Sequence, residues 1–172
     1  MTALTPSSSQ PTAVQQALGL LTAVLVCFAV SAVGAAASFQ ARAFYGDLAQ
    51  PDWAPPGWLF GPVWTVLFLL MAVSVWLVWR AGGFRERPWV AWVFIAQLAC
   101  NALWSWLFFA WQLGLPALLD IVALWSLIAL SIVGFWSITR LAGALLMPYL
   151  LWVSFAMALN YSLLELNPAV LG

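Results

Sequence analysis

Five residues in one apolar run of the chain have side chains that could contact a bound molecule. One face of a helix would carry the residues at positions i, i+4, i+7, i+8 and i+11, which here are Gln97, Asn101, Trp104, Ser105 and Phe108. An unpaired amide in hydrocarbon is costly, so this face should look into a bundle of helices. The amides there either hydrogen-bond to neighbouring helices or contact a ligand that also stacks on the aromatic rings. The pattern leaves both interpretations open.

Two other apolar runs carry aromatic faces of the same kind. In one, the shared face comprises Trp64, Phe68 and Met71. In the last, it comprises Trp152, Phe155, Ala156 and Leu159, with Asn160 beside it. We therefore consider Trp64, Trp104 and Trp152 candidates for the wall of a pocket. The tryptophans near the ends of the runs suit the aromatic belts of a membrane protein instead; they are Trp76, Trp79, Trp89 and Trp92.

Several kinds of catalytic group are absent from the sequence. The chain has no histidine, the commonest general base, metal ligand and haem axial ligand. It also lacks a Ser-His-Asp set, a metal-binding cluster and a phosphate-binding glycine loop. Asp120 and Glu165 fall at the ends of apolar runs, so proton-coupled transport lacks an intramembrane coupling group. What remains is a tryptophan-lined apolar interior, which suits a flat or rigid hydrophobic ligand and requires no metal or cofactor.

The composition identifies a membrane protein. Of 172 residues, 66% are hydrophobic and only 6% are charged, whereas a soluble domain carries about 25% charged residues. The formal net charge is zero, which gives a nucleic-acid partner no electrostatic support. Membrane lipid is the partner that such a surface requires.

The apolar runs predict an all-α, polytopic bundle of five transmembrane helices. A spanning helix needs about 20 mostly apolar residues, and five segments fit, at about 17–39, 61–80, 89–111, 117–138 and 143–164. Residues 1–16 form a polar tail that we expect to be disordered, and the membrane domain covers 17–168. A cleaved signal peptide is a poorer interpretation of the first run, because no Lys or Arg precedes it and its apolar stretch is too long.

The arginines predict the orientation of the bundle. Arg80, Arg85, Arg87 and Arg140 fall on the side of the N-terminus, and Arg42 alone on the other side. The positive-inside rule then places the N-terminus in the cytoplasm and the first loop outside, in what we expect to be a bacterial cell membrane.

The first loop, 40–60, leads into QPDWAPPGWLFGPVWT, a stretch rich in proline and tryptophan. Pro51, Pro55 and Pro56 restrict the backbone and favour extended neighbours, which predicts a stiff, non-helical cover. Trp53 and Trp58 could lie at the outer interface as a lid, with Trp64 one turn deeper.

The first span contains pairs of small residues four apart, Ser31–Ala35, Ala32–Ala36 and Gly34–Ser38. Such pairs permit close helix approach. They are explained equally by packing within one chain and by a homodimer.

Three segments, taken together and in order, resemble the tryptophan-rich sensory protein (TspO) and translocator-protein family, which includes the peripheral-type benzodiazepine receptor. They are FYGDLAQPDWAPPGWLFGPVWTVLF before and in the second span, AQLACNALWSWLFF in the third, and PYLLWVSFAMALNYSLLELN in the fifth. The resemblance covers about residues 17–168.

The resemblance implies a five-helix bundle, often dimeric, that binds protoporphyrin IX, haem or other tetrapyrroles between helices beneath the first loop. Carried over by motif, the ligand contacts would be Tyr45, Trp53, Pro55, Trp64, Asn101, Trp104, Trp152, Ala156 and Leu159. Phe68 and Gln97 join this set from the helical faces described above. Some relatives promote light-dependent breakdown of the porphyrin, which would make Trp64 and Trp152 catalytic.

The sequence departs from the family pattern at the loop. Phe44 replaces the usual tryptophan and Gln50 the usual lysine, which leaves Arg42 as the basic residue nearest the outer mouth. We favour a tetrapyrrole receptor or sensor, because binding alone requires no chemical group beyond those that these residues provide. The alternatives are a light-dependent porphyrin-degrading enzyme and a facilitator of porphyrin or lipophilic ligand transport.

Overall fold

The computed structural model describes residues 11–39 and 41–172, and every regular element in those ranges is a helix. Five segments are long and apolar enough to cross a membrane: Ala13–Ala37, Gly57–Arg80, Pro88–Ala110, Gly114–Trp136 and Arg140–Leu166. The all-α, five-span fold predicted from hydropathy is therefore confirmed. Lipid offers no partner for backbone N–H and C=O groups, so each apolar run pairs its own by forming a helix.

Some spans are built from more than one helical piece. The spans comprise α1 (Ala13–Ala37), the 3₁₀ turn η1 (Gly57–Leu59) with α3 (Phe60–Arg80), α5 (Pro88–Ser105) with the π-helical turn η2 (Trp106–Ala110), α6 (Gly114–Trp136), and α7 (Arg140–Leu145) with α8 (Met147–Leu166). Short helices outside the spans are α2 (Ala41–Asp47), α4 (Gly83–Glu86) and α9 (Pro168–Leu171).

The first span begins earlier than predicted. Helix α1 starts at Ala13 because Thr12 caps it: the Thr12 hydroxyl accepts from the Gln15 backbone N–H at 3.3 Å, and the Gln15 side chain accepts from the Thr12 N–H at 2.9 Å. The prediction of a disordered tail is thus wrong for 13–16, while residues 1–10 lie outside the described residues.

The first loop and the fourth span also differ from expectation. Residues 41–47 form helix α2, so the predicted non-helical cover is confined to the proline-rich stretch that follows. Helix α6 begins at Gly114, which places Asp120 almost two turns inside the span, with its Oδ2 buried and unpaired among the described residues. The earlier start therefore puts a carboxyl group where the hydropathy pattern indicated none.

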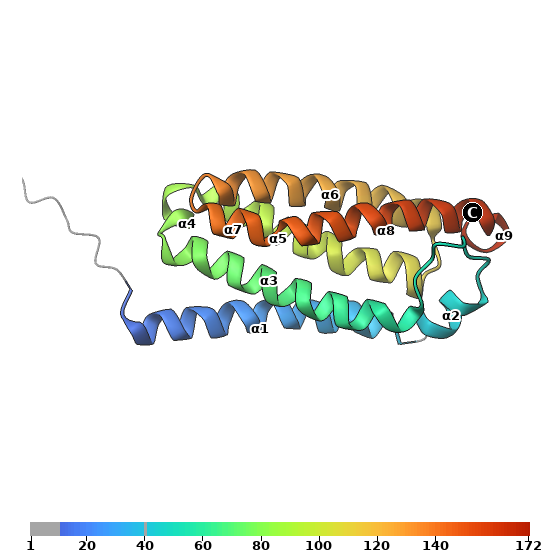
Figure 1. The fold of residues 1–172 in the computed structure, drawn as a ribbon, viewed down its shortest axis with the longest axis horizontal. Coiled ribbons are helices and arrows are strands. Elements are labelled where there is room, and N and C mark those ends of the chain that lie inside the picture. The colour runs from blue at the N-terminus through green and yellow to red at the C-terminus, as the bar shows by residue number, and fades with distance from the viewer. Residues whose placement is uncertain (1–10, 40) are drawn as a thin grey trace, which may run out of the picture.

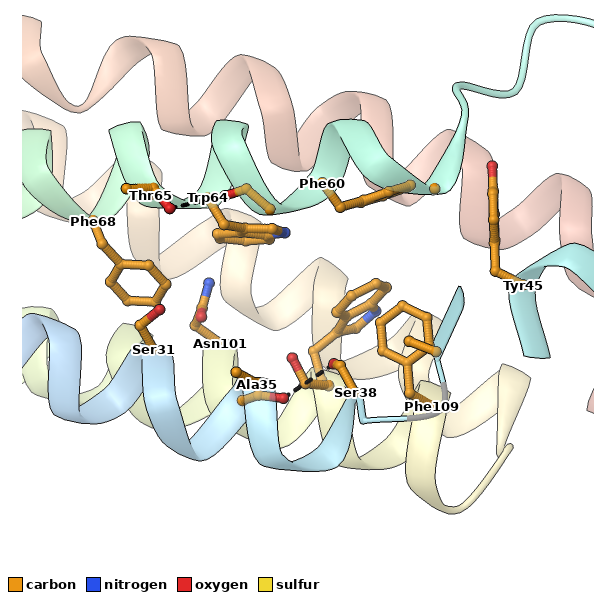
Figure 2. Close-up of a pocket in the computed structure, with 16 residues that line it drawn as sticks. Ser31, Ala35, Ser38, Tyr45, Phe60, Trp64, Thr65, Phe68, Asn101 and Phe109 are labelled. Atoms are coloured by element: carbon orange, nitrogen blue, oxygen red, sulfur yellow. Dashed lines mark hydrogen bonds between the residues drawn. The ribbon is translucent and has the colours of Figure 1, made fainter. Parts of the chain in front are cut away.

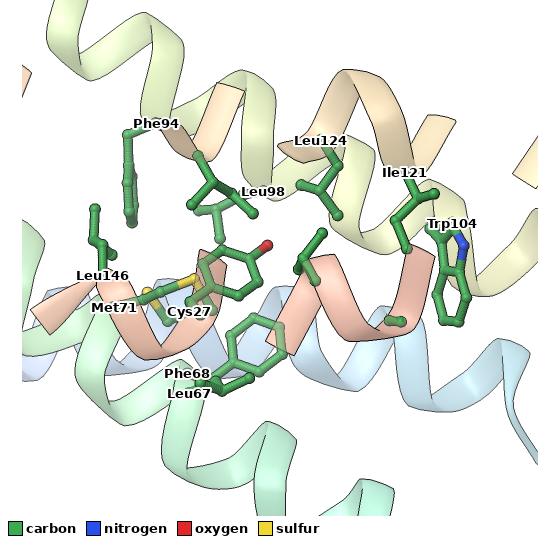
Figure 3. Packing of buried hydrophobic residues seen from close by; sticks show 14 of the residues in the cluster. Cys27, Leu67, Phe68, Met71, Phe94, Leu98, Trp104, Ile121, Leu124 and Leu146 are labelled. Carbon is green, nitrogen blue, oxygen red and sulfur yellow. The ribbon is translucent and has the colours of Figure 1, made fainter. Parts of the chain in front are cut away.

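The spans pack side by side into an elongated bundle (Figure 1). Helix α1 packs on α3 and α5, while α6 packs on α5 and α8. The proline-rich loop, α2 and α9 gather at one end, and α4 lies at the other. Figure 3 shows the centre of the bundle, where Met71, Phe94 and Leu124 are among the buried side chains.

The α4 end carries most of the positive charge. Arg85 lies in the short helix α4 and Arg87 caps its C-terminus, while Arg140 begins α7. Arg80 ends α3, with its guanidinium 4.9 Å from the centre of the Trp76 ring. An arginine over a tryptophan face is a favourable cation–π contact. The cytoplasmic position of this end stays a prediction.

Candidate functional site

A cavity of about 300 Å³ lies among α1, α3 and α5, beneath α2. Figure 2 shows its lining, with Phe68 at the inner end and Tyr45 and Phe60 at the outer end. The lining residues are Ser31, Gly34, Ala35, Ser38, Ala41, Tyr45, Gly57, Phe60, Gly61, Trp64, Thr65, Phe68, Asn101, Trp104, Ser105 and Phe109.

One wall of the cavity consists of the small residues of α1. A Cβ on Gly34 would lie 3.2 Å from the Ser105 hydroxyl, so the absent side chain permits α1 to approach α5 closely. Ser31, Ala35 and Ser38 line the same wall. The pairs Ser31–Ala35 and Gly34–Ser38 therefore lie at the cavity within one chain, whereas both residues of the pair Ala32–Ala36 are exposed. The homodimer stays a prediction.

The polar face of α5 hydrogen-bonds to other helices and also lines the cavity. The Asn101 side-chain N–H donates to the Tyr149 hydroxyl at 2.8 Å, and the Trp104 indole N–H donates to Asn160 Oδ1 at 3.2 Å. Gln97 lies deeper, outside the cavity, with Nε2 3.8 Å from the Met71 sulfur. Asn101 and Trp104 thus make the interhelical hydrogen bonds of one interpretation and also line the cavity, while their contact with a ligand stays a prediction.

The π-helical turn at the end of α5 changes which aromatic residue faces the cavity. A π turn contains one residue more than an α turn, so residues beyond it are rotated back around the helix. Phe109 lines the cavity as a result, whereas Phe108 is buried and stacks on Trp104 with ring centres 5.4 Å apart. The π turn explains why helical spacing selected Phe108 and missed Phe109.

Trp64 extends its ring across the cavity from α3 (Figure 2). The ring makes an edge contact with the Tyr149 ring, with centres 6.0 Å apart, and lies 5.9 Å from that of Phe68. Trp64 and Phe68, both predicted from the α3 face, are therefore placed at the cavity.

The first loop covers the outer end of the cavity and is held by hydrogen bonds. The Tyr45 hydroxyl donates to the Pro55 carbonyl at 3.1 Å, and the Gln50 side chain donates to the Tyr45 carbonyl. Burial raises the pKa of the Tyr45 hydroxyl, so the phenol remains a donor at neutral pH. Tyr45 thus lines the cavity as predicted, whereas Pro55 lies outside the lining and supplies the carbonyl that accepts from the Tyr45 hydroxyl.

A second attachment joins the loop to the last span. The Ala49 N–H donates to Asn167 Oδ1 at 2.8 Å, and Asn167 Nδ2 donates back to the Ala49 carbonyl at 2.9 Å. The same Nδ2 also donates to the Leu163 carbonyl at 2.8 Å. We call this arrangement the Asn167 clamp. It fixes the loop against the end of α8.

Besides Gln97, Pro55 and Trp152, three other predicted residues lie outside the cavity: Trp53, Ala156 and Leu159. Trp53 is 49% exposed and packs edge-on against Phe155, 5.7 Å between ring centres. Ala156 and Leu159 are buried in the core, because α8 packs against α6.

Trp152 lies on the far side of α3 from the cavity. It borders an outer apolar groove between α3 and α8, and its ring contacts the cavity residue Phe60 at 5.8 Å. The Trp152 indole N–H is buried without a partner in the described part of the chain. Trp152 therefore does not line the cavity itself but contacts Phe60, which does.

The sequence analysis missed most of the α1 wall as a ligand surface, together with Phe60 and Phe109. Small residues at close spacing indicate helix contact, and nothing in that spacing distinguishes a contact from the rim of a cavity. Phe60 could have been found from its place one turn before Trp64 on the same face of α3.

Comparisons with known proteins agree with this architecture. A family model described as the TspO/MBR family matches residues 23–166. The tryptophan-rich protein TspO of Chlorobaculum tepidum is 41% identical over 156 residues, which cover 90% of this chain and 99% of that protein. The translocator protein of Homo sapiens is 40% identical over 121 residues, 69% of this chain and 71% of that one.

A further relative is the tryptophan-rich sensory protein of Cereibacter sphaeroides, 33% identical over 147 residues, with 86% of this chain and 90% of that protein covered. The family model extends over all the residues that line the cavity, from Ser31 to Phe109. The chain therefore belongs to the TspO/MBR family.

Proposed function

We propose that this protein is an integral membrane receptor that binds a tetrapyrrole such as protoporphyrin IX in the cavity beneath the first loop. The observation that carries the proposal is the cavity, walled by the rings of Trp64, Trp104, Phe60 and Phe109 with the Asn101 amide between helices. Small-molecule sites are apolar clefts of about 300–1,000 Å³ with a few polar groups that fix orientation. A flat macrocycle stacks on such rings and needs no axial ligand.

The open side of the cavity supports a ligand that is larger than the enclosed volume. Ala35 and Thr65 are both exposed and both line the cavity, one on α1 and one on α3. A macrocycle could therefore insert one edge between the helices and extend its other edge towards the lipid. The positive-inside rule favours an orientation in which the loop and this site face outward. Relatives named as sensory and translocator proteins are consistent with a small-molecule receptor.

The proposal predicts saturable porphyrin binding that depends on Trp64. Protoporphyrin IX is titrated in the dark into protein in lipid nanodiscs, and the shift of its main absorption band is recorded. Replacing Trp64 with phenylalanine keeps an aromatic ring but reduces stacking area, so we expect affinity to fall roughly three- to tenfold.

The matched control is Trp92→Phe, because Trp92 is 70% exposed on another face of α5. This variant should bind as the wild type does. Binding that never saturates, or that is the same with empty nanodiscs, contradicts the proposal. Equal losses of porphyrin affinity in the two variants would show that the binding site is not the cavity.

Light-dependent porphyrin oxidation is a second candidate, favoured by the position of Trp64. An indole beside a bound, photoexcited macrocycle could donate an electron to it, with dissolved oxygen as the final oxidant. Because Trp152 lies behind Phe60, we expect Trp64→Phe to slow the loss of porphyrin absorbance under illumination more than Trp152→Phe does. Identical rates in wild type and the double variant would exclude the enzymatic candidate.

A further inference from the structure

We propose that the cavity selects electrically neutral ligands, so that a porphyrin lacking ionised carboxylates binds more tightly than the free acid. This inference rests on the proposed function, because it concerns the same cavity. It specifies the chemical class of ligand: a flat ring system whose edge carries neutral hydrogen-bonding groups in place of charges.

The lining residues provide no partner for an ionised carboxylate. Sixteen residues of the described chain line the cavity, and all have uncharged side chains. A carboxylate moved from water into apolar surroundings loses its hydration, and only a paired cation or several donors can offset that loss.

Most hydrogen-bond donors of the cavity are already used within the protein. The hydroxyl of Ser38 donates to the Gly34 carbonyl, and that of Thr65 to the Gly61 carbonyl. Tyr45 donates to Pro55, and the Trp104 indole N–H donates to Asn160. An oxyanion needs several converging donors, and these side chains do not supply them.

The polar groups that remain suit a neutral ligand. Within the described residues, neither the Trp64 indole N–H nor the Asn101 side-chain oxygen takes part in a hydrogen bond, although Asn101 Nδ2 does. Both side chains face the cavity (Figure 2). The Ser31 and Ser105 hydroxyls also line the cavity and make no hydrogen bond within the described residues. Because a hydroxyl both donates and accepts, these groups together with the Trp64 N–H and the Asn101 oxygen match a ligand edge of mixed neutral donors and acceptors, such as an N–H and a carbonyl or ester oxygen.

The charged residues at the outer end of the bundle also favour a neutral ligand over an anionic one. By sequence, the segments at this end carry the carboxylates Asp47, Asp52 and Glu165 against a single arginine, Arg42. Electrostatic repulsion extends about 8 Å at physiological ionic strength, so we expect this balance of charges to disfavour an anionic group near the first loop. Gln50, where the family usually has lysine, adds no positive charge, and its amide is occupied by the Tyr45 carbonyl.

The test compares protoporphyrin IX with its dimethyl ester, which has the same ring and no ionisable carboxyl group. Both are titrated into wild-type protein in nanodiscs, with partition into empty nanodiscs subtracted. We expect the ester to bind at least about tenfold more tightly, and the free acid to gain affinity as the pH falls towards about 4–5, where its carboxyl groups protonate. The ester should show no such gain.

Two substitutions of the same residue, one charged and one neutral, control for partition of the porphyrins into lipid. Ser38→Lys places an ammonium group at the cavity, and Ser38→Met is its uncharged counterpart of similar length. Relative to wild type, Ser38→Lys should shift the ratio of the two affinities towards the free acid by roughly tenfold. Ser38→Met should leave that ratio unchanged, whatever it does to both affinities. Thr65→Lys and Thr65→Met provide the same comparison from α3 if a Ser38 variant fails to fold.

The outcomes separate the two proposals. If the free acid binds as tightly as the ester and a lysine does not change the ratio, the neutral-ligand inference is wrong while tetrapyrrole binding stands. If neither compound binds saturably, the proposed function fails and this inference fails with it.

Discussion

Replacing Ala35 with tryptophan is expected to lower tetrapyrrole affinity by about 100-fold. Ala35 lines the cavity from α1 and is itself exposed, so a large side chain there can occupy the open side without displacing the core. Overfilling a packed site costs about 1–3 kcal/mol, and the upper end of that range corresponds to about two powers of ten in affinity. The porphyrin titration in nanodiscs measures the loss.

The neighbouring residue provides the control. Ala36 is also exposed but lies outside the cavity lining, so Ala36→Trp should fold and bind as the wild type does. The thermal unfolding temperature of both variants should be close to that of the wild type. Unchanged affinity in Ala35→Trp would show that the ligand binds elsewhere, for example in the groove bordered by Trp152.

The second large effect is expected on stability, at Asn160. Asn160→Leu keeps the approximate shape of the side chain but leaves the Trp104 indole N–H buried without its acceptor, and removes a weaker contact to the Gly114 carbonyl at 3.4 Å. We expect a loss of about 1–2 kcal/mol in the free energy of unfolding. Unfolding in mixed micelles with increasing SDS measures it.

A double-mutant cycle isolates the hydrogen bond from the loss of packing. Trp104→Phe removes the donor, so Asn160→Leu should cost less in that background than in the wild type. Strictly additive losses would show that the Trp104–Asn160 contact contributes nothing to stability. Because Trp104 also lines the cavity, porphyrin affinity should fall in both single variants.

Hydropathy predicted the spans well because the membrane leaves the chain few alternatives. What it missed were local effects at the ends of elements. The Thr12 capping box extends α1 to Ala13, and the proline-free stretch ARAFYGD forms α2 within a segment that was interpreted as loop. Both signals were present in the sequence, but the polar composition of the tail outweighed the first and the prolines of the first loop outweighed the second.

The candidate site was only partly predictable, because a helical face does not reveal which neighbour it meets. Tyr45, Trp64, Phe68, Asn101 and Trp104 do line one cavity. The motif face of α8 instead packs into the core or borders the outer groove, since α3 lies between Trp152 and the cavity. The π turn that presents Phe109 breaks the helical period on which face prediction relies.

The Asn167 clamp has a consequence for the order in which the chain is assembled. It joins residues 118 positions apart in sequence, and four spans lie between them. During synthesis, Ala49 emerges long before Asn167 exists, so the first loop waits without this attachment while those spans insert. The hydrogen bonds between the loop and Asn167 can therefore form only after the last span is in place. In a truncated or incompletely inserted chain, the loop over the cavity lacks this attachment.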